Sequence, residues 1–244
     1  MKTLTALLLC APLTSGGVPL NDPPALPEDL EVQLARSALP EHLRDEATVY
    51  VYRSGSGYEV VQHGSNGFHA LVGRDDPAIR HGTWPFDEYA EDILIPIAFD
   101  AAGTDHLRTY LDLGRWRATG VPASEAKRRL QEGFRSGRYG APPRSGVSYM
   151  LAPLLRAYRS TERDESIGTF MTPHYMFYAP GVTGRDIGSG PTLRHPVMLN
   201  ETPDPHGVIV LLAGEKEREQ TRQENEEMLE RLCALHTAWC LPAS

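Results

Sequence analysis

Cysteine, basic residues and long apolar runs are all scarce in this sequence of 244 residues. It has three cysteines, and its 24 basic residues are outnumbered by 32 acidic ones. The absence of a basic excess argues against a nucleic-acid or anionic-membrane partner. No long apolar run follows the N-terminus, so we expect no integral membrane segment in the mature chain. With 41% apolar residues, the chain can bury a sizeable core and is predicted to be globular.

The motifs of common catalytic and metal sites are also missing. None of the nine histidines belongs to an HxH, HxxxH or HExxH pair, which zinc sites usually contain. The segment GVSYM at 146–150 lacks the second glycine of a nucleophile elbow. Asp100 and Asp105 do not have the spacing of a calcium loop. The sequence therefore indicates no cofactor and identifies no reaction.

The first residues have the pattern of an export signal. Residues 1–17, MKTLTALLLCAPLTSGG, contain one lysine, an apolar run and then small residues where a peptidase cuts. The run of about ten apolar residues is shorter than the roughly 20 that a membrane span requires. We expect an exported soluble protein, periplasmic or extracellular. Lipid anchoring through Cys10 is the alternative, which the three bulky leucines before it disfavour.

Export would leave Cys233 and Cys240 as a pair in an oxidising compartment. A disulfide between them is favoured over two ordinary small apolar residues. An unbroken helix would separate them by about 10.5 Å, whereas a disulfide tolerates roughly 7 Å between Cα atoms. The disulfide therefore requires the helix to end near 236–238.

The rest of the chain is predicted to be a linker, 18–29, followed by a single α+β domain, 30–244. The linker is rich in proline, and Leu30 and Leu34 then begin a helical pattern that Pro40 ends. A second short helix follows Pro40. We expect a mainly antiparallel sheet, flanking helices and a long C-terminal helix over 215–240.

Alternating residues and glycine-rich turns predict three strands at 48–53, 58–62 and 67–73, joined as an antiparallel meander. Pro96 in the next apolar run favours an edge strand or a bulge. Further strands are predicted at 105–113, 145–153, 173–180 and 206–214.

The segment 122–137 is predicted to be a helix, with proline in its first turn and Gly137 at its end. Its cluster of Lys127, Arg128 and Arg129 has two interpretations. An ordinary solvated helix face is the favoured interpretation, and an anion site is the alternative.

The segment GTFMTPHYMFYAPG, 168–181, is the most aromatic part of the chain. Both faces of the strand at 174–179 are apolar or aromatic, which is typical of a strand covered on both sides. We therefore expect an interior strand with Tyr175 and Phe177 largely buried. The alternative is an active-site wall in which His174 is the reactive group.

Two classes of function remain open. His69, His174 and His206 lie at strand ends beside turns, and Asp100 ends the strand IPIAF. The favoured hypothesis is a noncatalytic module that binds a protein or small-molecule ligand. The alternative is a hydrolase or metal-dependent enzyme whose site contains His69, Asp100, Tyr149 and His174. Convergence of these four around one cleft would favour the enzyme, and dispersal would favour the module.

Several blocks occur in a characteristic order: EHLRDEATVYV, SNGFHALV, IPIAFDAAGT, EAKRRLQEGFRSGRYGAPPRSGVSYML and PHYMFYAPGVTGRDIG. In these blocks, over about 40–212, the chain resembles a family of uncharacterised exported bacterial proteins. The resemblance implies export and a shared fold, and it supplies no reaction. Members often carry cysteines in the NGF and PI blocks, where this chain has Ala70 and Ala98. A disulfide at that place is therefore absent.

Overall fold

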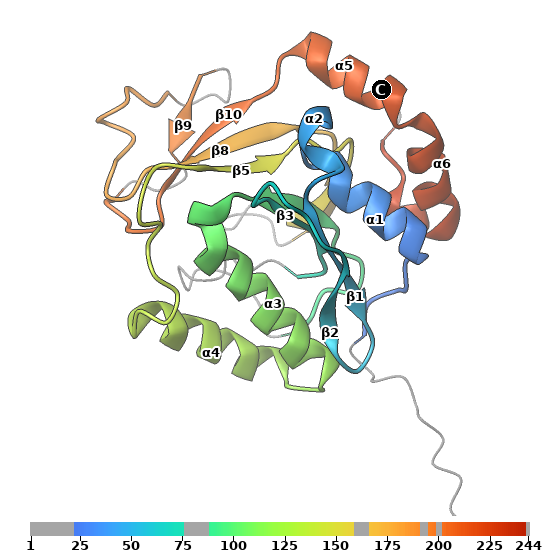
Figure 1. Cartoon of the computed structure of the whole chain (residues 1–244), viewed down its shortest axis with the longest axis horizontal. Helices are drawn as coiled ribbons and strands as arrows, with labels where there is room; N and C mark the ends of the chain where they lie inside the picture. Colours follow the sequence, from blue (N-terminus) through green and yellow to red (C-terminus); the bar gives the residue numbers. More distant parts are fainter. Residues whose placement is uncertain (1–21, 76–87, 159–165, 191–194, 199–201, 243–244) are drawn as a thin grey trace, which may run out of the picture.

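The computed structural model describes residues 22–75, 88–158, 166–190, 195–198 and 202–242. The predicted signal peptide, 1–17, its Cys10 and the first part of the linker lie outside these residues. The described chain forms an eight-stranded sheet in the order β2-β1-β3-β4-β5-β8-β10-β9 and a separate pair, β6-β7 (Figure 1). Helices flank the large sheet, so the α+β class is confirmed.

The strands of the large sheet are β1 (Thr48–Arg53), β2 (Gly57–Gln62), β3 (His69–Gly73), β4 (Ile95–Phe99), β5 (Val147–Met150), β8 (His174–Tyr178), β9 (Val197–Met198) and β10 (Val208–Leu212). The pair consists of β6 (Leu155–Tyr158) and β7 (Ile167–Phe170). The α-helices are α1 (Glu28–Ser37), α2 (Glu41–Arg44), α3 (Thr104–Ala118), α4 (Ala123–Arg135), α5 (Glu215–Glu224) and α6 (Glu226–Leu235). Two short 3-10 helices are η2 (Ala101–Gly103) and η3 (Thr237–Trp239).

The sheet is mostly antiparallel, but the predicted three-strand meander is wrong. β2 pairs with β1 at the edge of the sheet, and β1 then pairs in parallel with β3. After β2, the chain passes over the start of β1, and Gly64 lies at the point of closest approach. A Cβ at Gly64 would lie 2.2 Å from the Glu46 carbonyl oxygen, so only glycine allows this close crossing.

The segment predicted as a strand at 105–113 is part of the helix α3. Its buried residues His106, Thr109, Leu113 and Trp116 recur at helical spacing and face the interior. Asp100 starts this region, because its Oδ1 accepts hydrogen bonds from the backbone N–H groups of the η2 residues that precede α3. The alternation of apolar and polar residues that suggested a strand is only a short part of a longer helical pattern.

β4 is an interior strand, so the prediction of an edge at Pro96 is wrong. Leu94 forms a bridge with Arg156, whereas the pairing of β4 with β5 begins at Ala98. Pro96 falls between these two contacts. Proline has no backbone N–H to donate, and at position 96 neither β5 nor β6 pairs with the strand, so no hydrogen bond is lost on that side.

Helices pack on both faces of the sheet. α1 lies on β1, β3 and β4 and contacts α6, whereas α3 packs on β2, β3 and β4 and contacts α4 (Figure 1). Leu30 and Leu34 of α1 share one buried cluster with Met228 and Leu232 of α6. The first and last helices of the described chain thus complete the same core.

The predicted long C-terminal helix is wrong, because Asn225 separates α5 from α6. The backbone of Asn225 leaves the helical conformation, and its buried amide donates to the Thr221 carbonyl over 2.8 Å. No residue of α5 is buried, so no packing against the core stabilises α5 as a straight continuation of α6.

The predicted disulfide is present. α6 ends at Leu235, and the chain folds back through η3 to bring Cys240 to a Cα separation of 4.4 Å from Cys233. Trp239 is buried beside the disulfide, and its indole N–H donates to the Asp92 carbonyl over 2.8 Å. None of the described helices has the length and apolarity needed to span a bilayer.

Candidate functional site

The predicted site residues His69 and Asp100 both have structural partners. His69 begins β3, and its Nδ1 lies 3.1 Å from the Tyr50 hydroxyl. Burial lowers the pKa of this histidine. The Asp100 carboxylate accepts three hydrogen bonds from backbone N–H groups of the described residues: two in η2 and one from Val147. Asp100 therefore joins the start of the α3 region to β5.

Tyr149 and His174 lie further along the sheet. Tyr149 packs between the rings of Phe68 and Tyr175, and burial raises its pKa. His174 begins β8, and its Nδ1 lies 2.7 Å from the Thr172 carbonyl oxygen, to which an N–H at that position donates. Burial lowers the pKa of His174.

The four side chains do not gather around one cleft. Tyr149 pairs with Ala98 and shares its sheet face, close to Asp100. His69 alternates with Ala70 and so points to the opposite face. β8, which carries His174, is three strands away from β3. The structure therefore does not bring these four residues together in one site.

The third histidine near a strand end, His206, lies in a buried pair that the sequence did not indicate. Its Nδ1 is 3.2 Å from Nε2 of His106 on α3, and both side chains are buried. The rings of Phe134 and Tyr178 pack edge-on against this pair. Within the described ranges, no three His, Cys, Asp or Glu residues are placed to share a metal ion.

The aromatic strand β8 is interior as predicted, but the burial predicted for Phe177 is wrong. β8 lies between β5 and β10, yet the Phe177 side chain is 42% exposed and Tyr175 is partly buried. The helix α1 packs on β1, β3 and β4, whereas Phe177 lies on a strand beyond them. The two-sided apolar pattern therefore reflects one buried face and one half-exposed aromatic face.

A basic cleft lies between α3 and α4. It has a volume of about 400 Å³, and we call it the arginine cleft. Its lining contains four arginines, two aromatic residues and three further residues: Arg115, Trp116, Arg128, Arg129, Glu132, Gly133, Ser136, Arg138 and Tyr139.

The loop that follows α4 closes one end of the arginine cleft. Gly137 has a φ of +76°, which turns the chain back toward α3. Tyr139 then packs against Gly133, where a Cβ would lie 2.3 Å from the ring. Glycine is therefore required at position 133 if Tyr139 is to be buried in this place.

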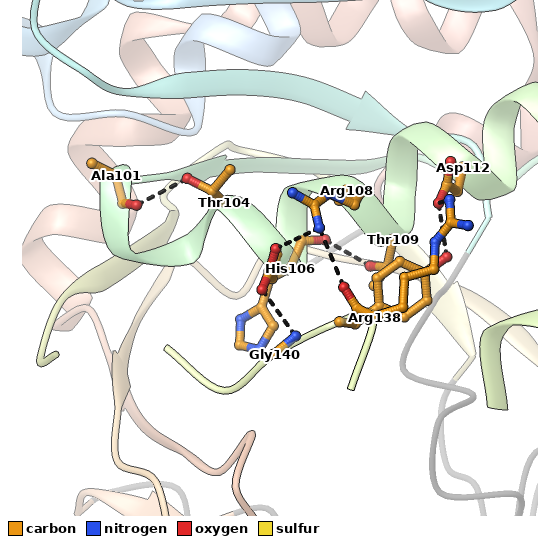
Figure 2. Close-up of polar contacts among 10 residues, drawn as sticks. Ala101, Thr104, His106, Arg108, Thr109, Asp112, Arg138 and Gly140 are labelled. Carbon is orange, nitrogen blue, oxygen red and sulfur yellow. Dashed lines mark hydrogen bonds and ion pairs between the residues drawn. The ribbon is translucent and has the colours of Figure 1, made fainter. Parts of the chain in front are cut away.

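Hydrogen bonds fasten this loop to α3 (Figure 2). The Gly140 N–H donates to Asp105 over 2.9 Å, and Arg108 donates to the Arg138 carbonyl over 3.2 Å. The Arg138 guanidinium donates to Asp112 over 2.7 Å, as does the Tyr139 hydroxyl over 2.9 Å. The position of Arg138 at the cleft is thus fixed through both its backbone and its side chain.

The four arginines form two pairs, each of which shares one carboxylate. Arg115 and Arg138 contact Asp112 over 3.0 and 2.7 Å. On α4, Arg128 and Arg129 contact Glu125 over 2.7 and 2.8 Å.

The two pairs leave a positive charge in excess. Hydrogen bonds from Arg128 and then Arg129 lower the pKa of Glu125 to about 2, so this carboxylate is ionised at neutral pH. Four guanidinium groups face two carboxylates, and the lining Glu132 is itself paired with Arg135. Counted over these described groups alone, the four arginines exceed Asp112 and Glu125 by two positive charges.

Two of these guanidinium groups also lie over aromatic rings. Arg129 lies 5.6 Å from the ring centroid of Trp116, and Arg138 lies 5.7 Å from that of Tyr139. Contact with a ring face favours a cation and restricts its side chain. One arginine of each pair is therefore held in place before any ligand arrives.

The sequence singled out two of the residues that line this cleft. Arg128 and Arg129 belong to the basic cluster whose favoured interpretation was a solvated helix face and whose alternative was an anion site. Arg115 was missed because its segment adjoins the one that was assigned to a strand. Arg138 was missed because nothing local shows that the loop folds back onto α3.

Searches for similar proteins found no matching family model, curated protein or solved structure.

Proposed function

We propose that this protein is a noncatalytic binding module that holds a small anionic ligand in the arginine cleft. The observation that carries the proposal is the excess of guanidinium groups over carboxylates at one concave surface. Arginine binds phosphate, sulfate and carboxylate groups through two parallel N–H donors. All four arginines line the cleft, whereas Asp112 and Glu125, the carboxylates that they contact, are not among the lining residues.

Size and charge support this assignment. The volume of about 400 Å³ lies within the range of roughly 300–1,000 Å³ that is common for small-molecule sites. The chain as a whole has a formal charge of −8. The net negative charge would by itself repel an anion. The positive charge of the cleft is therefore a local feature that anion binding would require.

The chemistry of the lining favours binding over catalysis. Among the described residues that line the cleft there is no histidine and no cysteine, and the single carboxylate, Glu132, is paired with Arg135. The lining therefore offers hydrogen-bond donors and positive charge, and it offers no free general base.

Isothermal titration calorimetry with inorganic phosphate at low ionic strength tests the proposal. Arg129→Gln should weaken phosphate binding by about tenfold or more, since a hydrogen bond to a charged group contributes roughly 1.5–3 kcal/mol. Arg231→Gln is the matched control, because Arg231 is also a surface arginine paired with a carboxylate, Asp29, on other elements. Absence of phosphate binding, or equal loss in both variants, would contradict the proposal.

We also propose that the module acts outside the cytoplasm. The disulfide between Cys233 and Cys240 supports this, because disulfides persist mainly in oxidising compartments. The sequence of residues 1–17 gives the same indication. N-terminal sequencing of the protein recovered from fractionated cells of its source tests the proposal. An uncleaved protein in the cytoplasmic fraction would contradict it.

A further inference from the structure

We infer that the ligand of the arginine cleft carries two adjacent phosphate-like groups, one for each pair of arginines. This inference rests on the proposed function and makes it more specific. It follows from the way in which the positive charge is divided between the two walls of the cleft.

The first group is assigned to the α3 wall. Arg115 and Arg138 approach Asp112 from the end of α3 and from the loop after α4. The carboxylate neutralises one of the two charges, and it also accepts the Tyr139 hydroxyl. One positive charge remains on this wall, with both guanidinium groups about half exposed at the cleft.

The second group is assigned to the α4 wall. Arg128 and Arg129 are adjacent residues of one helix, and both donate to Glu125 one turn earlier. They again leave one positive charge, and both side chains are at least 40% exposed. Two separate excess charges on opposing walls fit a ligand with two anionic groups better than a single monoanion.

The space between the walls limits the size of the ligand. A volume of about 400 Å³ admits a small molecule. Trp116 and Tyr139 also line this space, and Arg129 and Arg138 lie over their rings. The ligand class is thus a small molecule with a diphosphate or an equivalent pair of acidic groups.

Calorimetry with inorganic phosphate, pyrophosphate and tripolyphosphate at matched ionic strength tests this inference. Pyrophosphate is expected to bind in a 1:1 complex, about tenfold or more tightly than phosphate. The double variant Arg128→Gln/Arg129→Gln should weaken the binding of both anions and reduce that preference to less than about threefold, because the residual binding of either anion is confined to the α3 wall. Arg231→Gln should leave the preference unchanged.

A second variant protects the test against misfolding. Arg115→Gln removes the more exposed partner of Asp112 and leaves Arg138 in place. It should also reduce the preference for pyrophosphate, and a thermal melt will show whether the fold is retained.

The outcomes separate the inference from the proposed function. If phosphate binds at the cleft and pyrophosphate binds no more tightly, the inference is wrong and the proposed function stands. If none of the three anions binds, both are wrong. Sedimentation with phosphatidylglycerol vesicles distinguishes a lipid headgroup from a free ligand. Vesicle binding without pyrophosphate binding would overturn the assignment to a small molecule.

Discussion

The Arg117 guanidinium donates to the Asp75 carboxylate over 2.8 Å, and the two side chains are only 1% and 2% exposed. Arg117 also donates to the Arg74 carbonyl over 2.9 Å and lies over the Tyr89 ring. This buried contact ties the end of α3 to the chain that leaves β3.

Arg117→Ala is expected to lower the free energy of unfolding by about 3–5 kcal/mol, because it leaves a buried carboxylate without this partner. Urea denaturation measures the loss. The surface variant Arg231→Ala, which breaks an exposed pair with Asp29, should leave the urea midpoint nearly unchanged. Equal losses of unfolding free energy in the two variants would show that the buried contact with Asp75 stabilises the fold no more than an exposed ion pair does.

Phe177→Ala is expected to cost less than about 1 kcal/mol, since the ring is half exposed and its removal leaves no closed cavity. Leu34→Ala provides the comparison, because this residue is fully buried and should cost about 2–5 kcal/mol. Chemical denaturation of both variants checks the contrast. A loss of 3 kcal/mol or more at Phe177 would mean that this face of β8 is covered.

The stability of the protein is expected to fall as the pH decreases below about 6.5, in part because of His174. Burial lowers the pKa of His174 in the folded state. The unfolded chain therefore binds a proton first, at about pH 6.5, and the free energy of unfolding decreases from there until the lower folded pKa is reached.

His174→Gln should make this pH dependence shallower, and the same change at the exposed His42 is the control. Urea midpoints between pH 5 and 8 measure the slopes. An unchanged slope for His174→Gln would show that another group accounts for the effect.

Removal of the disulfide is expected to cost about 2 kcal/mol, because the loop it closes is short. Cys233→Ser/Cys240→Ser should also release Trp239 from its contact with Asp92, which a red shift of tryptophan fluorescence would report. Intact mass with and without thiol alkylation checks the bond itself. Alkylation of both cysteines in the unreduced protein would contradict the structure.

Local pattern predicted the elements whose residues alternate or repeat within one segment. β1, β2, β3 and α4 are examples, because their residues alternate or recur at helical spacing between clear turn signals. The parallel pairing of β1 with β3 could not be predicted, since it depends on the crossing at Gly64 rather than on either strand.

The residues of the cleft could be predicted only in part, again because they come from segments that are distant in sequence. Arg128 and Arg129 were visible as a basic cluster on one helix, whereas their partners in the cleft come from α3 and from a loop. The exposure of Phe177 was missed because composition does not show how far the helix α1 extends over the sheet. Both depend on the tertiary arrangement of distant segments.

The shared core of α1 and α6 has a consequence for synthesis of the chain. Leu30 and Leu34 are among the first apolar residues of the domain to be made, and their partners Met228 and Leu232 are among the last. The part of this cluster that α6 supplies is therefore missing until residues 226–235 have been made, whereas β1, β3 and β4, which also pack on α1, are made much earlier. Until α6 has been made, Leu30 and Leu34 lack the α6 side of their core, and chaperones can bind the apolar surface that remains uncovered.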